Sequence, residues 1–300
     1  VLFDGIRSYI NVLKQSRLLD IAKRNERTLQ DQLDLESARV ERGSGLAVDV
    51  LQAKSRLQLA RERVVSLLGD LREAHSVYLE LFNRPAAPAL MSRPQIPRDS
   101  LPETVDAALA VANSENVVLK ISNRDVDIAS EERTVAQSTY WPRIDLVGEG
   151  AWEKNVDGVP GVRREGQVTV RAIWSLFDGF LTSASSAKAL KNYGTSLDRR
   201  RFVDRDVQNR VRQAWSRYRT SREQWELLEN AVNIASEVFE ARKKLRQAGR
   251  ESVINVLDAE NELNSARLRY TNATFNHILA SYRVLFQTGR LTPETLNLAK

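Results

Sequence analysis

The sequence contains no cysteine, which excludes a disulfide framework and any chemistry that depends on a thiol. Histidine is almost as scarce, with His75 and His277 the only two, both in stretches expected to be helical. A lone histidine on a helix is more often packed or solvent-facing than a ligand. No phosphate-binding glycine loop and no catalytic constellation is present. We therefore expect neither an enzyme nor a metal or cofactor site.

Long apolar runs are missing as well. No stretch of about 18 apolar residues is present, so neither a membrane-spanning helix nor a signal peptide is visible. The net charge of +6 is small and spread along the chain, which disfavours a nucleic-acid partner. Charged residues of both signs make up 28% of the chain, and this density is typical of long helices with exposed faces.

Proline is concentrated in one segment. Five of the eight prolines lie within residues 84–102, where repeated X–Pro steps favour an extended path outside the folded body. By contrast, Leu181 to Ala248 has no proline and one interior glycine, Gly194. As a single helix these roughly 68 residues would span about 100 Å, too long for a compact domain of this size. Such a helix needs neighbouring helices along its whole length.

One segment of the chain occurs twice. GSGLAVDVLQAKSRLQLARER at 43–63 and GRESVINVLDAENELNSARLR at 249–269 share eight positions: Gly43/Gly249, Val50/Val256, Leu51/Leu257, Ala53/Ala259, Leu57/Leu263, Ala60/Ala266, Arg61/Arg267 and Arg63/Arg269. Each copy has helical spacing after a glycine, and basic residues precede that glycine. We expect the turns of two long helical hairpins, and hence one elongated unit built twice.

The hairpins are expected at defined places. Helices are predicted at 6–42, 46–82, 105–111, 116–139, 181–248 and 253–287, with a turn at 43–45. Val1 aligns with Val207, inside the long helix of the second copy. We therefore expect this chain to be a trimmed or partial form that lacks a first β-hairpin upstream.

A different periodicity follows Pro142. Arg143–Lys154 and Gln167–Leu176 alternate apolar and polar residues and predict two strands, joined by a loop at 155–166. Their length suits tilted membrane-spanning strands, with a lipid-facing set of Val168, Val170, Ala172, Trp174 and Leu176. Gln167, Thr169 and Arg171 would face a lumen, and Trp141, Trp152 and Trp174 would suit an aromatic girdle. The alternative is a soluble hairpin packed on a helix.

The sequence thus divides into six parts. We expect a first helical hairpin at 1–83, a proline-rich linker at 84–102, entry helices at 103–140, a transmembrane β-hairpin at 141–179, a second helical hairpin at 180–292 and a C-terminal exit at 293–300. One hairpin cannot close a barrel, and an open sheet edge in lipid would leave backbone groups unpaired. Several chains must therefore assemble.

Four motifs indicate a family resemblance, and their order along the chain is part of that evidence. They are Asp106–Leu146, Val168–Gly179, AVDVLQAKSRL at 47–57 and VINVLDAENEL at 253–263. Over essentially its whole length the chain resembles the TolC family of outer-membrane channel proteins of Gram-negative bacteria. The resemblance implies a mainly α fold of very long antiparallel hairpins that form an α-barrel tunnel. It also implies two internal structural repeats and a β-hairpin that contributes to a trimeric twelve-strand barrel.

The resemblance also implies a function and its partners. The family supplies the outer-membrane exit duct, with a periplasmic extension, of tripartite export systems. The stretch VDGVPGVRREGQVTVRAIWSLFDG is most similar to members that serve type I protein secretion, of adhesins or RTX-type proteins. Expected partners are two further copies, a periplasmic adaptor (membrane fusion protein), an inner-membrane ABC or RND transporter and outer-membrane lipid. The alternatives are a multidrug efflux channel and a soluble coiled-coil scaffold or periplasmic adaptor.

The family's periplasmic gate maps onto the second copy of the repeat. The family has acidic residues at the positions of Asn255 and Asp258, and only Asp258 is acidic here. The aligned residues of the first copy are Asp49 and Gln52. The family's gate arginine falls at Glu251, so the latch of this protein must differ. The acids could instead simply favour a helix N-terminus.

The turns are the expected docking tips for the adaptor. They comprise Gly43, Ser44, Gly45, Gly249, Arg250 and Glu251. The alternative is that these residues only close the loops between helices.

Overall fold

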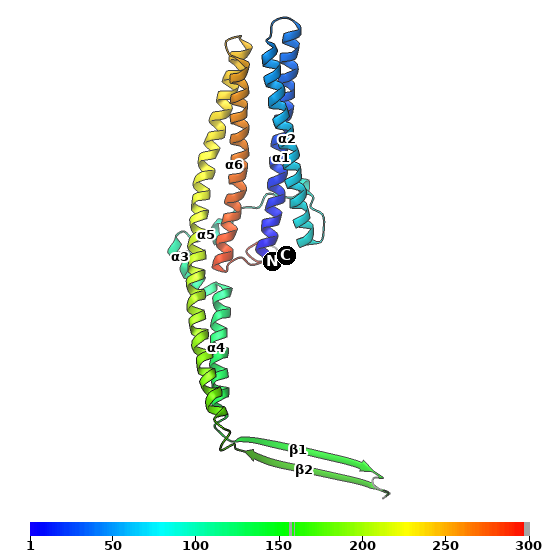
Figure 1. Cartoon of the computed structure of the whole chain (residues 1–300), viewed down its shortest axis with the longest axis vertical. Coiled ribbons are helices and arrows are strands. Elements are labelled where there is room, and N and C mark those ends of the chain that lie inside the picture. The colour runs from blue at the N-terminus through cyan, green and yellow to red at the C-terminus, as the bar shows by residue number, and fades with distance from the viewer. Residues whose placement is uncertain (156–157, 159, 297–300) are drawn as a thin grey trace. The chain divides into compact units, whose positions relative to one another are not determined.

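The computed structural model describes residues 1–155, 158 and 160–296 and is mainly helical, with one small antiparallel sheet (Figure 1). Part of the predicted exit at 293–300 and part of the predicted loop at 155–166 lie outside the described residues. The helices and strands are, in order, α1 (Leu2–Glu41), α2 (Ala47–Phe82), α3 (Val105–Glu115), α4 (Val117–Ser138), β1 (Arg143–Lys154), β2 (Val162–Ile173), α5 (Leu181–Gln247) and α6 (Val253–Thr288).

The chain forms two compact units. The first unit contains Val1–Asn116 and Gln208–Lys300, and the second contains Val117–Val207. Helix α5 contributes its early residues to the second unit and the rest to the first. No helix among the described residues is both long and apolar enough to cross a membrane.

The first unit contains two helical hairpins, α1 with α2 and the later part of α5 with α6. The predicted turns are confirmed. Gly43 and Gly249 have φ angles of 74° and 73°, a left-handed conformation that glycine adopts without steric cost. Gly45 also needs to be glycine, because a Cβ there would lie 2.9 Å from the backbone nitrogen of Val40.

A seam of small and branched residues joins the two hairpins. Leu29 of α1, Leu57 and Ala60 of α2 and Val253 and Leu257 of α6 form one buried cluster. Because alanine has a short side chain, it lets the helix backbones approach closely. A second cluster, at the opposite end of α6, contains Phe3, Ile10, Phe275, Ile278, Tyr282 and Leu285.

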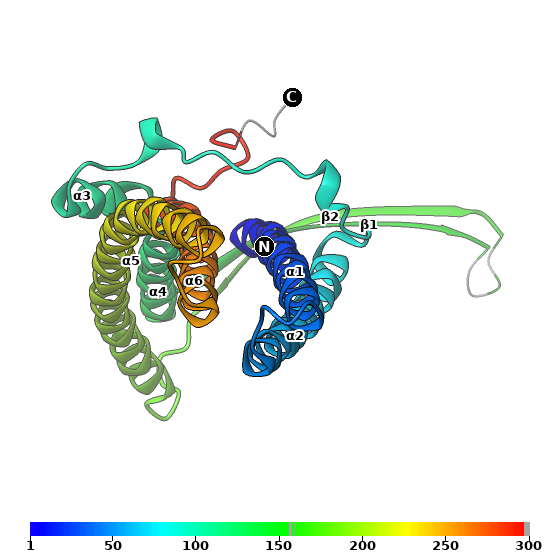
Figure 2. The same ribbon diagram turned by 90° about the horizontal axis from the view of Figure 1, so that it is seen from above.

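The proline-rich linker follows the extended path predicted for it, interrupted by two short 3₁₀ turns, Pro88–Leu90 and Arg98–Ser100. It passes from the end of α2 to α3 (Figure 2). Two hydroxyl groups hold it: Tyr9 Oη donates to Ser92 O at 2.9 Å, and Tyr282 Oη donates to Gln95 O at 2.7 Å.

Helix α3 docks against the end of α6. The guanidinium of Arg290 makes a two-pronged contact with the carboxylate of Glu115, at 2.9 and 3.0 Å. Gly289 ends α6 with φ 88°, and a Cβ there would lie 2.5 Å from Glu115 O. Only glycine permits so close an approach.

The second unit contains α4, the two strands and the start of α5. The strands pair over twelve residues each, from Arg143↔Ile173 to Lys154↔Val162. The ladder gives the hairpin two distinct faces. Ile144 and Leu146 share one face with Val168, Val170 and Ala172, because directly paired residues point to the same side. The opposite face carries the pairs Asp145↔Arg171, Val147↔Thr169, Glu149↔Gln167 and Glu153↔Arg163.

The predicted bounds of the second strand are wrong at both ends. The strand is Val162–Ile173 rather than Gln167–Leu176, because backbone pairing continues through polar residues that show no alternation. Trp174 and Leu176, predicted to be strand residues, therefore lie beyond the ladder. The Trp174 indole instead donates to Tyr140 O at 3.2 Å and ties the base of the hairpin together.

The bounds of the helices agree closely with the sequence prediction. The main difference in the first helix is that α1 begins at Leu2 rather than Ile6. The helix predicted at 105–111 extends to Glu115, and Asn116 separates it from α4. The N-cap of α3 is Thr104, whose side chain accepts from Ala107 N.

Candidate functional site

The predicted gate residues lie at the turn ends of the two hairpins, and one arginine connects several of them. Arg246, at the end of α5, contacts Glu36 of α1 at 3.0 Å and Asp49 of α2 at 3.8 Å. It also donates to Glu251 O at 3.2 Å. Residues from both hairpins therefore meet at a single guanidinium, and we call Glu36, Asp49 and Arg246 the tip cluster.

Glu36 is the most buried member of the tip cluster. Its side chain is 6% exposed, against 25% for Arg246 and 17% for Asp49. It also accepts from Arg39 at 2.9 Å. A buried carboxylate needs such partners, because its desolvation is costly unless charge and hydrogen bonds compensate. The sequence predicts only a helix stop from the basic residues before Gly249, and it gives no signal for Glu36.

Glu251, one of the predicted gate residues, makes a local set of contacts. Its Oε1 accepts from Asn255 Nδ2 at 2.6 Å and from Ser252 N at 3.0 Å, and Arg242 lies 3.5 Å away. These hydrogen bonds, chiefly that from Asn255, lower the pKa of Glu251. Two of the predicted gate residues, Glu251 and Asn255, thus bind each other.

Asp258 and Gln52 lie further along their helices. Asp258 forms an ion pair with Arg56 of α2 at 2.6 Å, a contact between the two hairpins. Among the residues that the structure describes, none forms a hydrogen bond with the buried Oε1 of Gln52. The structure of the single chain therefore brings Asp49, Glu251 and Asn255 into one neighbourhood around Arg246, and pairs Asp258 separately.

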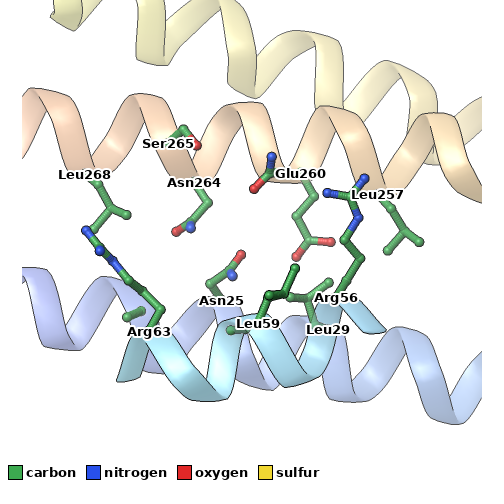
Figure 3. A pocket seen from close by; sticks show the side chains of 13 residues that line it. Asn25, Leu29, Arg56, Leu59, Arg63, Leu257, Glu260, Asn264, Ser265 and Leu268 are labelled. Atoms are coloured by element: carbon green, nitrogen blue, oxygen red, sulfur yellow. The ribbon is translucent and has the colours of Figure 1, made fainter. Parts of the chain in front are cut away.

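A polar cavity of about 270 Å³ lies among α1, α2 and α6, next to that ion pair (Figure 3). The carboxylate of Glu260 faces it, together with Asn25 and Asn264. Glu260 is 5% exposed and accepts from Gln32 Nε2 at 2.6 Å. Burial raises its pKa to about 7, although Gln32, Lys243 and Arg267 act in the opposite direction.

The predicted docking tips are exposed turn residues. Gly43, Ser44, Gly249 and Arg250 are exposed, and Gly45 and Glu251 are half-buried. The backbone N–H and the hydroxyl of Ser44 both bond to Arg39 O, at 3.0 and 3.2 Å. The tips are therefore ordered by their own helices and leave their outer surfaces open.

The predicted lipid-facing residues are exposed in the isolated chain. Val168 and Val170 are 77% and 70% exposed, and Ala172 lies beside them on the same face. Trp174 and Leu176 are exposed too, beyond the end of the strand. An apolar face of this kind needs an apolar environment or a partner.

His277 is buried, and its ring stacks on Tyr218 with centroids 5.1 Å apart. Its Nδ1 lies 3.1 Å from Ser221 Oγ, and desolvation lowers its pKa. His75 is half-buried on α2. Among the residues that the structure describes, no group of three or more His, Cys, Asp or Glu is arranged to hold a metal ion.

Comparisons with known proteins agree with this architecture. The family model described as outer membrane efflux protein matches residues 109–289. Among curated relatives, the outer membrane efflux protein BepC of Brucella suis is 21% identical, over 99% of this chain and 65% of its own length. The alkaline protease secretion protein AprF of Pseudomonas aeruginosa is 25% identical, over 98% and 62%. The outer membrane protein TolC of Escherichia coli is 21% identical, over 96% and 61%.

The solved structures that the chain resembles have the same fold. A membrane protein from Pseudomonas aeruginosa has a TM-score of 0.77 at 16% identity, with 95% of this chain and 67% of that chain covered. The outer membrane protein VceC of Vibrio cholerae has a TM-score of 0.75 at 14% identity, with 96% and 69% covered. The chain spans less than two thirds of the length of the curated relatives named above. The chain belongs to the outer membrane efflux protein family and is a protein of the outer membrane.

Proposed function

We propose that the chain is one subunit of a trimeric outer-membrane exit duct, a passive channel in a tripartite export system. The observation that carries the proposal is the two-faced β-hairpin attached to very long helical hairpins. The apolar face of the hairpin suits lipid, and its charged and polar face suits a water-filled lumen. An enzymatic role is not part of the proposal.

Assembly follows from the open edges of the hairpin. In the described part of the chain each strand has one edge without a strand partner, and lipid offers no hydrogen bonds to backbone groups. We propose that the full protein supplies a second hairpin from an upstream repeat, so that three subunits close a twelve-strand barrel. The six-part division of the chain and the two internal repeats belong to this proposal.

In the proposed trimer the helical hairpins form the periplasmic tunnel. Helix α5 has 67 residues, which at 1.5 Å per residue is about 100 Å. The tips at Gly43–Gly45 and Gly249–Glu251 would dock on the periplasmic adaptor, with an inner-membrane ABC or RND transporter behind it. Asp49, Gln52, Glu251, Asn255 and Asp258 would lie near the tunnel mouth and form its gate.

We propose type I protein secretion as the export system. The protein is 25% identical to a relative named for the secretion of an alkaline protease, and that name supports the assignment. Multidrug efflux is the second candidate, favoured by the name of the Brucella relative and by the description of the family. Deleting the gene and measuring secreted protein together with drug susceptibility distinguishes the two systems.

The channel itself is tested by reconstituting the full-length protein in a planar bilayer and recording single-channel conductance. We expect steady pores, and a trimer band on gels that dissociates on heating. A protein that stays soluble without detergent and forms neither pores nor a heat-modifiable trimer would instead be a coiled-coil scaffold or an adaptor.

A further inference from the structure

The proline-rich linker covers a cavity of about 590 Å³ between α1 and α6. Four arginines line it: Arg17 and Arg24 from α1, Arg93 from the linker and Arg267 from α6. Residues 17 and 24 are seven apart, so they lie on one face of α1. Three segments that are distant in the sequence therefore contribute positive charge to one hollow.

The linker segment that lines this cavity is fixed in place by side chains of the helices. Tyr9 of α1 binds Ser92 O and Tyr282 of α6 binds Gln95 O, so the backbone is fixed on both sides of Arg93. The Met91 side chain, two residues before Arg93, packs against the cluster that contains Tyr78. Arg93 is thus held over the cavity by residues from both hairpins.

The charge of the cavity is unbalanced. Its lining contains one carboxylate, Asp20, against the four guanidinium groups. Within the described part of the chain, none of the four arginines makes an ion pair, whereas Arg56 and Arg246 in the same unit do. Like charges gathered in one place repel, and a bound anion would relieve that repulsion.

The cavity also has an apolar floor. Ile21 and Phe275 are 8% and 7% exposed, and Leu13 and Met91 lie beside them. A space of about 590 Å³ is much larger than one inorganic phosphate needs and falls in the range of small-molecule sites. The site therefore combines anion recognition with room for an apolar group.

We propose that this cavity binds a small organic polyanion. Its phosphate or carboxylate groups meet Arg17, Arg24, Arg93 and Arg267, and its apolar portion lies on Ile21 and Phe275. Guanidinium groups suit both kinds of anion, because their donors match the spacing of paired oxygen atoms. This site is separate from the tip cluster and does not depend on the proposed channel function.

The test is calorimetric titration of the full-length protein in detergent at low ionic strength. The probes are inorganic phosphate, citrate and 1-naphthyl phosphate. We expect naphthyl phosphate to bind about tenfold or more tightly than inorganic phosphate, since its ring reaches the apolar floor. Arg93→Gln and Arg267→Gln should each weaken that binding by roughly tenfold or more.

Two further variants distinguish binding in the cavity from nonspecific attraction to surface charge. Arg27 is exposed on α1 and does not line the cavity, so Arg27→Gln should leave binding unchanged. Tyr282→Phe removes a tether of the linker and no charge, and it should weaken binding. Circular dichroism checks that each variant keeps its helices. Arg93 is an exposed linker residue, so its substitution should disturb folding least among these variants.

Several results would overturn the proposal. One is the absence of binding heat for all three probes. Another is equal affinity for inorganic and naphthyl phosphate, or a loss in Arg27→Gln as large as that in Arg93→Gln, which would indicate diffuse attraction. If an oligoglutamate peptide binds and none of the three probes does, the surface docks protein and the small-molecule site is wrong.

Discussion

At the scale of single residues, Arg246 connects the two hairpins near their turns. Its guanidinium contacts Glu36 and Asp49, whose carboxylates come from two other helices. Arg246→Met would leave the buried Glu36 carboxylate with Arg39 as its remaining ion-pair partner among the described residues. We expect a loss of about 2 kcal/mol in the free energy of unfolding, because the buried carboxylate loses one of its two charged hydrogen-bond partners. Denaturant unfolding, followed by helical circular dichroism, measures it.

Arg250→Met is the matched control, because Arg250 is an exposed arginine of the same turn. It should change stability by less than about 0.5 kcal/mol. Adding Glu36→Leu to Arg246→Met should recover part of the loss, since the double variant no longer buries the carboxylate. Equal stability of Arg246→Met and the parent chain would show that the tip cluster does not hold the hairpins together.

Glu260 makes stability depend on pH. Burial raises its pKa to about 7 from an ordinary value of 4.5, so the folded chain keeps a proton that the unfolded chain releases between these values. The contribution to folding is therefore complete below pH 4.5 and is lost as the pH rises towards 7. The loss is on the order of 3 kcal/mol at most. Glu260→Gln should remove this slope.

Thermal melting between about pH 5 and pH 8 tests this expectation. The parent chain should melt at a lower temperature at the alkaline end, and Glu260→Gln should show a flatter profile. Glu262→Gln is the control, because Glu262 lies on the same helix and is exposed. If Glu260→Gln retained the full slope, the responsible group would be elsewhere.

The sequence located some of these residues and not their partners. The family resemblance predicts a gate position at Asp258, and the repeat aligns Asp49 with Asn255, the other predicted position. Arg56, the partner of Asp258, is 202 positions away, and Glu36 lies 210 positions from Arg246. Spacing along one helix carries no information on such pairs, because they depend on how two hairpins pack. Glu36 gives no sequence signal of burial, since it lies among many exposed charges.

At the scale of elements, the β-hairpin offers a matched pair of neighbouring residues. Val170 lies on the apolar face and Thr169 on the polar one. We expect Val170→Arg to impair membrane assembly of the full-length protein, by about 2–4 kcal/mol if the residue lies at the bilayer midplane. Thr169→Arg should be tolerated, because its side would face water. The yield of heat-modifiable trimer from outer membranes measures both variants.

Equal yields from the two variants would contradict the assignment of faces. Loss of both would point instead to a general intolerance of added charge in the strand. Val168→Arg, two residues before Val170 on the same face, should behave as Val170→Arg does. If both variants lower the trimer yield, the loss is a property of the apolar face and not of a single position.

Elements were easier to predict than their ends. Gly43 and Gly249 fixed both turns, because a glycine after basic residues is a strong helix stop and both glycines do adopt positive φ. The second strand was misplaced, since alternation stops at Gln167 while backbone pairing continues to Val162. Backbone hydrogen bonds do not require alternating side chains, so the charged Arg164, on the same face as Val168 and Val170, concealed that part of the strand.

At the scale of the whole molecule, the acids at the proposed tunnel mouth are partly neutralised within each chain. Asp258 is paired with Arg56, whose side chain is 32% exposed. In a trimer, each of these charges would occur three times around one opening. The block of the pore by multivalent cations should therefore depend on the balance between Asp258 and Arg56, not on Asp258 alone.

This balance gives two variants with opposite expected effects in the reconstituted full-length channel. Asp258→Ala removes negative charge and should weaken block by a trivalent cation added on the periplasmic side. Arg56→Gln removes the counter-charge and should strengthen it, several-fold at low ionic strength, because salt screens the field of a wide opening. Glu262→Ala, on the exposed side of α6, should leave the block unchanged. If Asp258→Ala and Arg56→Gln shifted the blocking concentration in the same direction, or not at all, these residues would not line the pore. Asp258 would then act only through its ion pair between the two hairpins.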